Sequence, residues 1–101
     1  MKQWYSDCVR HILRDYIDTI ETGATPKFRT TAERVNWTAC HDVMTTLNHE
    51  NVKLVCEIYR RGDTIADNIY RIATDGRVSQ GRFWNLVDDI EYKVAEKRGL
   101  I

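Results

Sequence analysis

The sequence predicts an all-α protein: about five helices in a compact bundle, with a C-terminal helix-turn-helix followed by a long last helix. Three observations predict this fold class. Apolar residues recur at intervals of three and four along most of the chain. Residues that favour helix ends stand before or after these segments. No segment alternates apolar and polar residues in the way that is typical of a strand.

The composition is typical of one folded domain whose positive and negative charges balance. Hydrophobic residues make up 43% of the 101 residues and charged residues 30%, so we expect a single helical domain over residues 1–101. Lys and Arg total 15, as do Asp and Glu, which counts against a strong nonspecific DNA binder. No apolar run is long enough to span a membrane, so we expect a cytoplasmic protein without a membrane partner.

The first two helices are expected on either side of a loop. Gly23 and Pro26 end the first helix, and the loop runs to about Arg29. Thr30 and Glu33 then have the spacing of a capping box at the start of the second helix. The apolar stripe expected on the first helix consists of Trp4, Val9, Ile12, Leu13, Tyr16 and Ile20.

The third helix is expected to follow the second almost without a linker. Asn48 suits the N-cap position better than a helix interior. With Asn48 as the cap, Leu47 and Val52 stand where a hydrophobic staple places its two apolar residues. Gly62 suits the end of this helix, because glycine adopts a positive φ without strain.

The last two helices have similar boundary residues. Asp63 or Thr64 is suited to cap the fourth helix, which we expect to end near Asp75–Gly76. Ser79 is suited to cap the fifth, which we expect to run to about residue 98 and to be closed by Gly99.

These two helices, approximately residues 64–98, have the pattern of a helix-turn-helix. Ala73 permits close contact between the helices, while Val78 and Phe83 are placed as apolar residues around the turn. In that geometry the start of the second helix enters a major groove, with flanking arginines on the phosphates. The side chains expected at this surface are Arg71, Arg77, Ser79, Gln80, Arg82 and Asn85. The same pattern is also typical of a tight corner in a bundle without any partner.

The segments "VCEIYRRGDTIADNIYRIATDGRVSQGRFWNLVDDI" and "VAEKRGLI" resemble the helix-turn-helix of sigma-factor region four. They look most like the versions in phage transcription regulators of the ArpU and RinA type, and the likeness covers roughly the second half of the chain. The resemblance implies a phage-type regulator that binds DNA through its last two helices. It places Ser79, Gln80, Arg82 and Asn85 at the bases and Arg71 and Arg77 at the phosphates. The first half looks like small phage and prophage proteins.

An alternative function is suggested by acidic residues on the last helix. Residues 79–91 contain one positive and three negative side chains, which would repel phosphates unless the acids point away. Small phage proteins include inhibitors of host defence, such as anti-CRISPR proteins, which occupy a partner's functional surface. The alternative partner is therefore a host protein or nucleoprotein complex, and the residues expected to contact it are Trp84, Asp88, Asp89 and Glu91.

Catalysis and metal binding are not expected. Cys8, His11, Cys40 and His41 are of the residue types that bind zinc, but no CxxC motif occurs, and adjacent helical residues diverge by about a quarter turn. We expect reduced thiols, no disulfide, no cofactor and no enzymatic activity. The sequence leaves open whether the chain acts as a monomer or as a homodimer that reads paired half-sites.

Overall fold

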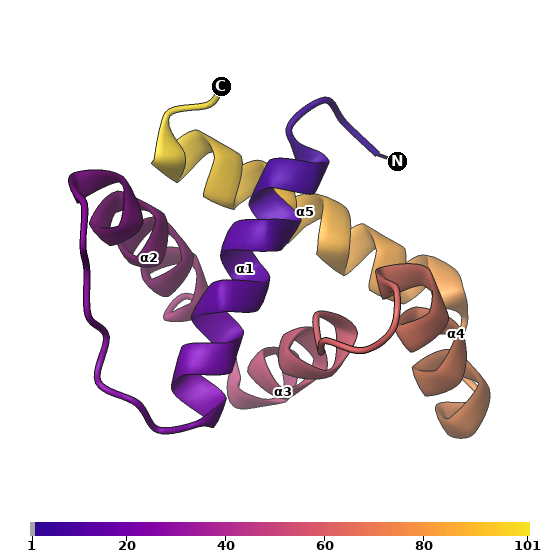
Figure 1. Cartoon of the computed structure of the whole chain (residues 1–101). Coiled ribbons are helices and arrows are strands. Elements are labelled where there is room, and N and C mark those ends of the chain that lie inside the picture. Colours follow the sequence, from indigo (N-terminus) through magenta and orange to yellow (C-terminus); the bar gives the residue numbers. More distant parts are fainter. Residues whose placement is uncertain (1) are drawn as a thin grey trace.

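The computed structural model describes residues 2–101, and over that range it contains five α-helices (Figure 1). This confirms the all-α class. Their bounds are α1 Ser6–Glu21, α2 Thr31–Met44, α3 His49–Ile58, α4 Ile65–Gly76 and α5 Gln80–Arg98. The Cα radius of gyration is 13.3 Å, close to the value of about 13 Å for a compact chain of this length, so the bundle is compact.

The predicted caps of α2 and α3 are present. The Thr30 hydroxyl accepts a hydrogen bond from the backbone N–H of Glu33 at 3.1 Å. The Glu33 carboxylate accepts in turn from the N–H of Arg29 at 2.7 Å, one residue before the position that a capping box uses. The Asn48 side chain accepts from the N–H of Asn51 at 2.8 Å. The bonds to Glu33 and Asn51 each satisfy an amide that the helix itself leaves unpaired.

The ends of α4 and α5 follow the same local rules. Thr64, rather than Asp63, caps α4, since its hydroxyl accepts from the N–H of Asp67 at 3.1 Å. Ser79 caps α5 by accepting from the N–H of Gly81 at 3.2 Å. Gly99 ends α5 with φ at +81°, as predicted for the residue after the helix.

Helix α5 is the central element of the bundle. In Figure 1, α1 crosses α5, α2 lies to one side, and α4 packs at the opposite end of α5. Helix α3 packs against α4. The largest fully buried apolar side chains come from all but α2: Tyr59, Leu13, Ile17, Ile58, Ile69, Ile90, Val9, Val55, Val87 and Val94.

Two residues assigned to the stripe of the first helix are not in the core. Trp4 is 74% exposed, because α1 begins only at Ser6 and Trp4 lies before it. Ile20 is 39% exposed on the last turn of α1, while Ile17 is buried. The stripe is therefore shorter than predicted and is shifted toward the middle of the helix. None of the helices over residues 2–101 is both long and apolar enough to cross a membrane.

Candidate nucleic-acid interface

The turn between α4 and α5 has an unusual backbone. Arg77 adopts φ +53° and ψ +41°, the left-handed conformation that normally favours glycine, although Gly76 is the residue before it. The N–H of Val78 donates to the Ala73 carbonyl at 3.0 Å, and the N–H of Arg77 donates to the Thr74 carbonyl at 3.4 Å. These are the two bonds of a Schellman motif, which ends α4 and redirects the chain into α5.

Buried residues on both helices hold this corner. Ala73 on α4 and Phe83 on α5 are each 4% exposed, and Val87 is 1% exposed. Val78 in the turn is partly buried and packs against the same core. Because the inner faces of α4 and α5 are occupied in this way, the outer face at the start of α5 is turned to solvent. The arrangement is a helix-turn-helix in the structural sense.

The predicted base-reading residues are all exposed. Arg82 and Asn85 are three residues apart on α5 and therefore share its outer face. Gln80 is the first residue of α5, where the helix N-terminus carries a partial positive charge. The Ser79 oxygen already accepts the capping bond, so Ser79 also has a structural role.

Arg71 and Arg77, the predicted phosphate contacts, lie in different electrostatic surroundings. Arg71 is exposed, but its guanidinium donates to Asp63 at 3.3 Å and to the Asn68 side-chain oxygen at 3.1 Å. Arg77 is exposed in the turn, and no ion pair within residues 2–101 engages it. Of the two, Arg77 has the charge that is more available to a ligand.

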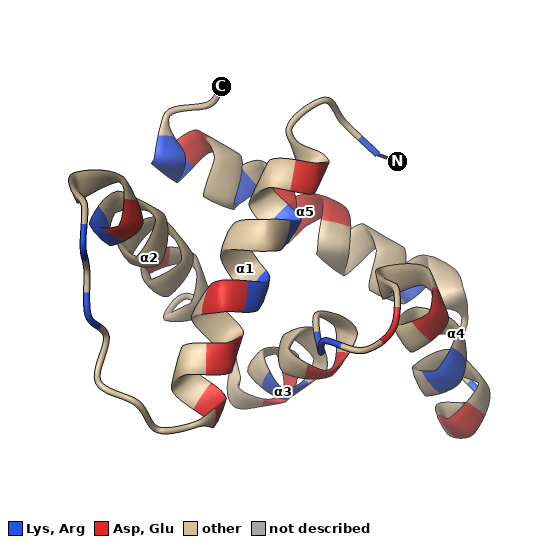
Figure 2. Ribbon diagram, viewed as in Figure 1, with Lys and Arg blue, Asp and Glu red and all other residues tan. Residues whose placement is uncertain are grey.

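Charges of both signs surround the corner, as Figure 2 shows for α4, where red and blue segments follow one another. Asp67 and Asp75 lie on α4 with Arg71 between them, so this helix does not present a continuous basic stripe. Residues 76–87, by contrast, contain two arginines and no acidic residue. The positive part of the corner is therefore the turn and the first two turns of α5.

The prediction that Glu91 contacts a partner protein is wrong, because its side chain is buried. Its side chain is 2% exposed and is held by two partners. The Nε of Arg10 donates to Glu91 Oε2 at 2.8 Å, and the Tyr59 hydroxyl donates to the same oxygen at 2.7 Å. Glu91 is buried because α1 and the end of α3 cover this side of α5, so it is not accessible to a partner.

The other residues of that proposed face differ from one another. Trp84 is partly buried and packs against the core. Asp88 is half-buried, and Asp89 is exposed with its carboxylate 2.9 Å from Lys93 Nζ. Asp89 shares the outer face of α5 with Arg82 and Asn85, but the ion pair with Lys93 partly neutralises it. The acidic run is thus weaker at the surface than its sequence indicated.

Three polar residues, Ser6, Asn68 and Glu91, are buried without having been predicted so, and two of them connect separate elements. Glu91 stands four residues after Val87 and three before Val94, on the same helical face as these core valines. Asn68, which is 1% exposed, donates to the carbonyls of Ile58 at 2.8 Å and Arg60 at 3.1 Å, and so ties α4 to the end of α3. Both positions follow the apolar periodicity, which was the available signal.

The cysteine and histidine residues do not form a metal site. No group of three or more potential ligands gathers anywhere in residues 2–101. Cys40 is fully buried, and burial raises the pKa of its thiol to about 12, which opposes the thiolate that zinc requires. His41 is exposed, with its Nδ1 3.0 Å from the Tyr16 hydroxyl. Cys8 is exposed.

Comparison of the chain with protein-family models, curated proteins and solved structures yields no match. The resemblance to sigma-factor region four therefore stays a prediction from the sequence. Support for a function has to come from the chemistry of the α4–α5 surface itself.

Proposed function

We propose that this protein is a DNA-binding regulator of transcription in which the start of α5 enters a major groove. One observation carries the proposal: Gln80, Arg82 and Asn85 are exposed together on an acid-free segment that begins at a helix-turn-helix corner. The width of the major groove admits one α-helix, and base edges there present a distinct pattern for each base pair. The three side chains supply the donors that such readout uses.

Each side chain has a base for which its geometry is suited. The Arg82 guanidinium can donate two parallel hydrogen bonds to guanine O6 and N7. Gln80 and Asn85 carry amides that pair with adenine N6 and N7. Gly81 lies between Gln80 and Arg82, and a Cβ added there would meet only the Ser79 hydroxyl oxygen, at 3.5 Å. The missing side chain therefore leaves the backbone free to approach a groove closely.

The backbone conformation of Arg77 supports the proposal. A glycine would adopt this conformation without strain, yet the chain has an arginine there. A left-handed conformation costs a non-glycine residue about 1 kcal/mol. A local backbone cost of this kind often persists where the side chain has a function. We assign Arg77 to a phosphate beside the groove, since its guanidinium is exposed and is engaged in no ion pair within residues 2–101.

The small number of cations limits the electrostatic part of the affinity. Each phosphate contact contributes about −0.9 to the slope of log K against log salt. Contacts from Arg71 and Arg77, together with the N-terminus of α5, would give a slope of about −2 to −3 for one copy. A homodimer that reads two half-sites about 10 base pairs apart would double this slope.

The test begins with selection of duplexes from a randomised pool at low salt, followed by fluorescence anisotropy on the enriched sequence. We expect Arg82→Ala to weaken binding to the selected site by about tenfold and to relax the base preference at one position. Arg34→Ala is the matched control, because Arg34 is exposed on α2, far along the chain from the corner. If no sequence is enriched, or if both variants lose the same affinity, the proposal is wrong.

Arg77→Gly adds a second arm to this experiment. Glycine removes the side chain and also relieves the backbone, so a folded and stable variant is expected. Its affinity for DNA should fall by a similar factor for every sequence, and its salt slope should become shallower by about 1. An unchanged slope would remove Arg77 from the interface.

A second candidate is a protein-binding adaptor or inhibitor of a host system, for which the exposed aromatic residues are the specific observation. Trp4 is 74% exposed and makes an edge contact with Tyr5 at 5.6 Å between ring centroids. Tyr92 on α5 is 51% exposed, and Tyr5, Asp88 and Tyr92 line one shallow hollow. Exposed aromatic residues of this kind are typical anchors of protein interfaces.

A comparison of two variants distinguishes the DNA-binding function from the protein-binding function. Trp4→Ala should abolish association with a protein partner and leave DNA binding unchanged, since Trp4 lies before α1 and not at the α4–α5 corner. Arg82→Ala should do the opposite. Affinity capture with the two variants in parallel measures the first effect, and anisotropy measures the second. A partner retained equally by both variants would remove Trp4 from the interface.

A further inference from the structure

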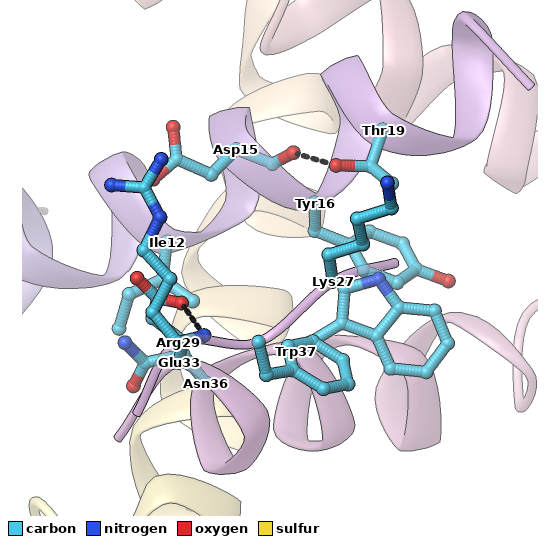
Figure 3. Close-up of a pocket in the computed structure, with 10 residues that line it drawn as sticks. Ile12, Asp15, Tyr16, Thr19, Lys27, Arg29, Glu33, Asn36 and Trp37 are labelled. Atoms are coloured by element: carbon cyan, nitrogen blue, oxygen red, sulfur yellow. Dashed lines mark hydrogen bonds between the residues drawn. The ribbon is translucent and has the colours of Figure 1, made fainter. Parts of the chain in front are cut away.

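A hollow between α1, α2 and the segment that joins them has features of a ligand site. Its volume is about 330 Å³, near the lower end of the range for small-molecule sites. Figure 3 shows side chains from all three elements converging on it. It is distinct from the α4–α5 corner, because every residue that lines it lies between positions 12 and 37.

Aromatic rings form much of its wall. The indole of Trp37 has Phe28 on one side, at 6.0 Å between ring centroids, and Tyr16 at 5.3 Å. His41 stacks on the same indole at 4.6 Å and 15°, and the Tyr16 hydroxyl is 3.0 Å from His41 Nδ1. These contacts hold the rings in place, so the wall is largely preformed for a flat apolar group.

One polar atom in this wall has no partner. Trp37 Nε1 is buried and lacks a hydrogen-bond acceptor within residues 2–101. Buried donors without an acceptor are rare in native proteins, because leaving one unpaired costs about as much as a lost hydrogen bond. In Figure 3 the nitrogen edge of the indole lies on the side of the Lys27 side chain. The nitrogen itself has almost no accessible surface, so a ligand in the hollow contacts the indole ring and not this atom.

The charges at the hollow favour an anion. Asp15 is paired with Arg61, and the Glu33 carboxylate accepts the backbone N–H of Arg29. Lys27 and the Arg29 guanidinium also line the hollow, and no ion pair within residues 2–101 engages either of them. Asp15 is therefore neutralised by Arg61, whereas Glu33 keeps its charge, so among the described residues two unpaired cations face one unpaired carboxylate at the hollow.

We propose that this hollow binds a small aromatic carboxylate: its flat ring lies against Trp37 and Phe28, and its carboxylate takes the Lys27 and Arg29 charges. The aromatic side chains of the wall select the ring, and the two cations select the anion. A neutral aromatic alcohol would leave the cations unused. An aromatic amine would meet two positive charges against the single unpaired carboxylate of Glu33.

The probes are three naphthalenes of nearly equal size: 1-naphthoate, 1-naphthalenemethanol and 1-naphthylmethylamine. The readout is the indole N–H resonance of Trp37 in a proton–nitrogen correlation spectrum, identified by its loss in Trp37→Phe. Naphthoate should shift this resonance saturably, with a Kd of about 1 mM. The alcohol should bind more weakly by about threefold or more, and the amine should bind more weakly still.

Surface variants keep the proposal testable if Trp37→Phe fails to fold. Each of the variants Lys27→Gln and Arg29→Gln should bind naphthoate about threefold more weakly. Their affinity for the alcohol should be unchanged. Lys53→Gln, on the exposed side of α3, is the matched control and should change nothing. Equal binding of all three probes would overturn the choice of an anion. Absence of any saturable shift at Trp37 would overturn the site.

Discussion

Arg10 on α1 and the buried Glu91 on α5 form an ion pair across 81 positions of sequence, with the partly buried Arg10 donating from Nε to Glu91 Oε2 at 2.8 Å. A second bond joins Arg10 Nη2 to Glu91 Oε1 at 3.3 Å, so the pair is bidentate. Tyr59, the residue just after α3, also donates its hydroxyl to Glu91 Oε2. One carboxylate thus connects three separate parts of the bundle.

We expect Arg10→Leu to lower the free energy of unfolding by about 3 kcal/mol, because it leaves the Glu91 charge buried without its partner. Lys93→Leu is the control, since it breaks an exposed pair with Asp89 and should cost less than about 1 kcal/mol. Urea unfolding monitored by circular dichroism measures both. The double variant Arg10→Leu/Glu91→Leu should recover part of the loss, and a further loss instead would contradict the burial penalty.

Alkaline conditions should destabilise the protein through Tyr59. Burial and the neighbouring Glu91 carboxylate raise the pKa of Tyr59 well above its usual value of 10.0. The folded state therefore holds this proton more tightly than the unfolded state, and the resulting stability is fully present below pH 10 and is lost as the pH rises toward the folded pKa. The expected slope for this residue is about −1.4 kcal/mol per pH unit above pH 10.

Tyr59→Phe tests this assignment. At pH 8 the variant should be less stable than the parent protein, because Glu91 loses one hydrogen bond. Above pH 10 its stability should fall less steeply with pH. Burial also raises the pKa values of Tyr16 and Cys40, so some decline is expected to remain. Parallel curves for the two proteins would show that Tyr59 is not the group responsible.

Arg77→Gly should raise the free energy of unfolding by about 0.5–1 kcal/mol, because glycine adopts the observed φ of +53° without steric cost. Gly99→Ala is the converse control: it places a side chain at φ +81°, where the surrounding space is open, so any loss of about 1 kcal/mol reflects the backbone alone. Thermal or urea unfolding measures both. A destabilised Arg77→Gly variant would mean that the arginine makes contacts that outweigh the backbone cost.

The three thiols should react at well-separated rates with an aromatic disulfide reagent at pH 8. Cys8 is exposed and should react first. Cys40 is buried, and a thiol pKa of about 12 leaves only about one molecule in ten thousand as thiolate at this pH. Cys56 is partly buried, with its thiol pKa raised by burial, and should be intermediate. Labelling of Cys40 as fast as Cys8 would show that the core opens readily.

The helix boundaries were largely readable from the sequence because capping is a local interaction. The bonds of Thr30, Asn48 and Thr64 each reach a backbone N–H three residues ahead. Such bonds depend on residue type and spacing, and both are visible in the chain. The corner between α4 and α5 was predicted for the same reason, although the left-handed position falls on Arg77 and not on the glycine beside it.

The predicted interface was less complete because exposure depends on what packs against a helix. The six residues assigned to DNA contact are all at the surface, but the pairing of Arg71 with Asp63 was not foreseen. The ligand hollow was missed entirely. It requires α1 and α2 to meet around Trp37, and a contact between two helices is not visible in the pattern of either one.

The sequence by itself determined the all-α class, the positions where helices begin and end, and the helix-turn-helix corner, since these follow from contacts within a few residues. Only the tertiary structure decided that Glu91 is buried with Arg10, that Trp4 is exposed, and that a cavity forms beside Trp37. The physical reason is distance along the chain. A partner 81 positions away buries a residue and pairs its charge, but the residues next to it in the sequence do not reveal that contact.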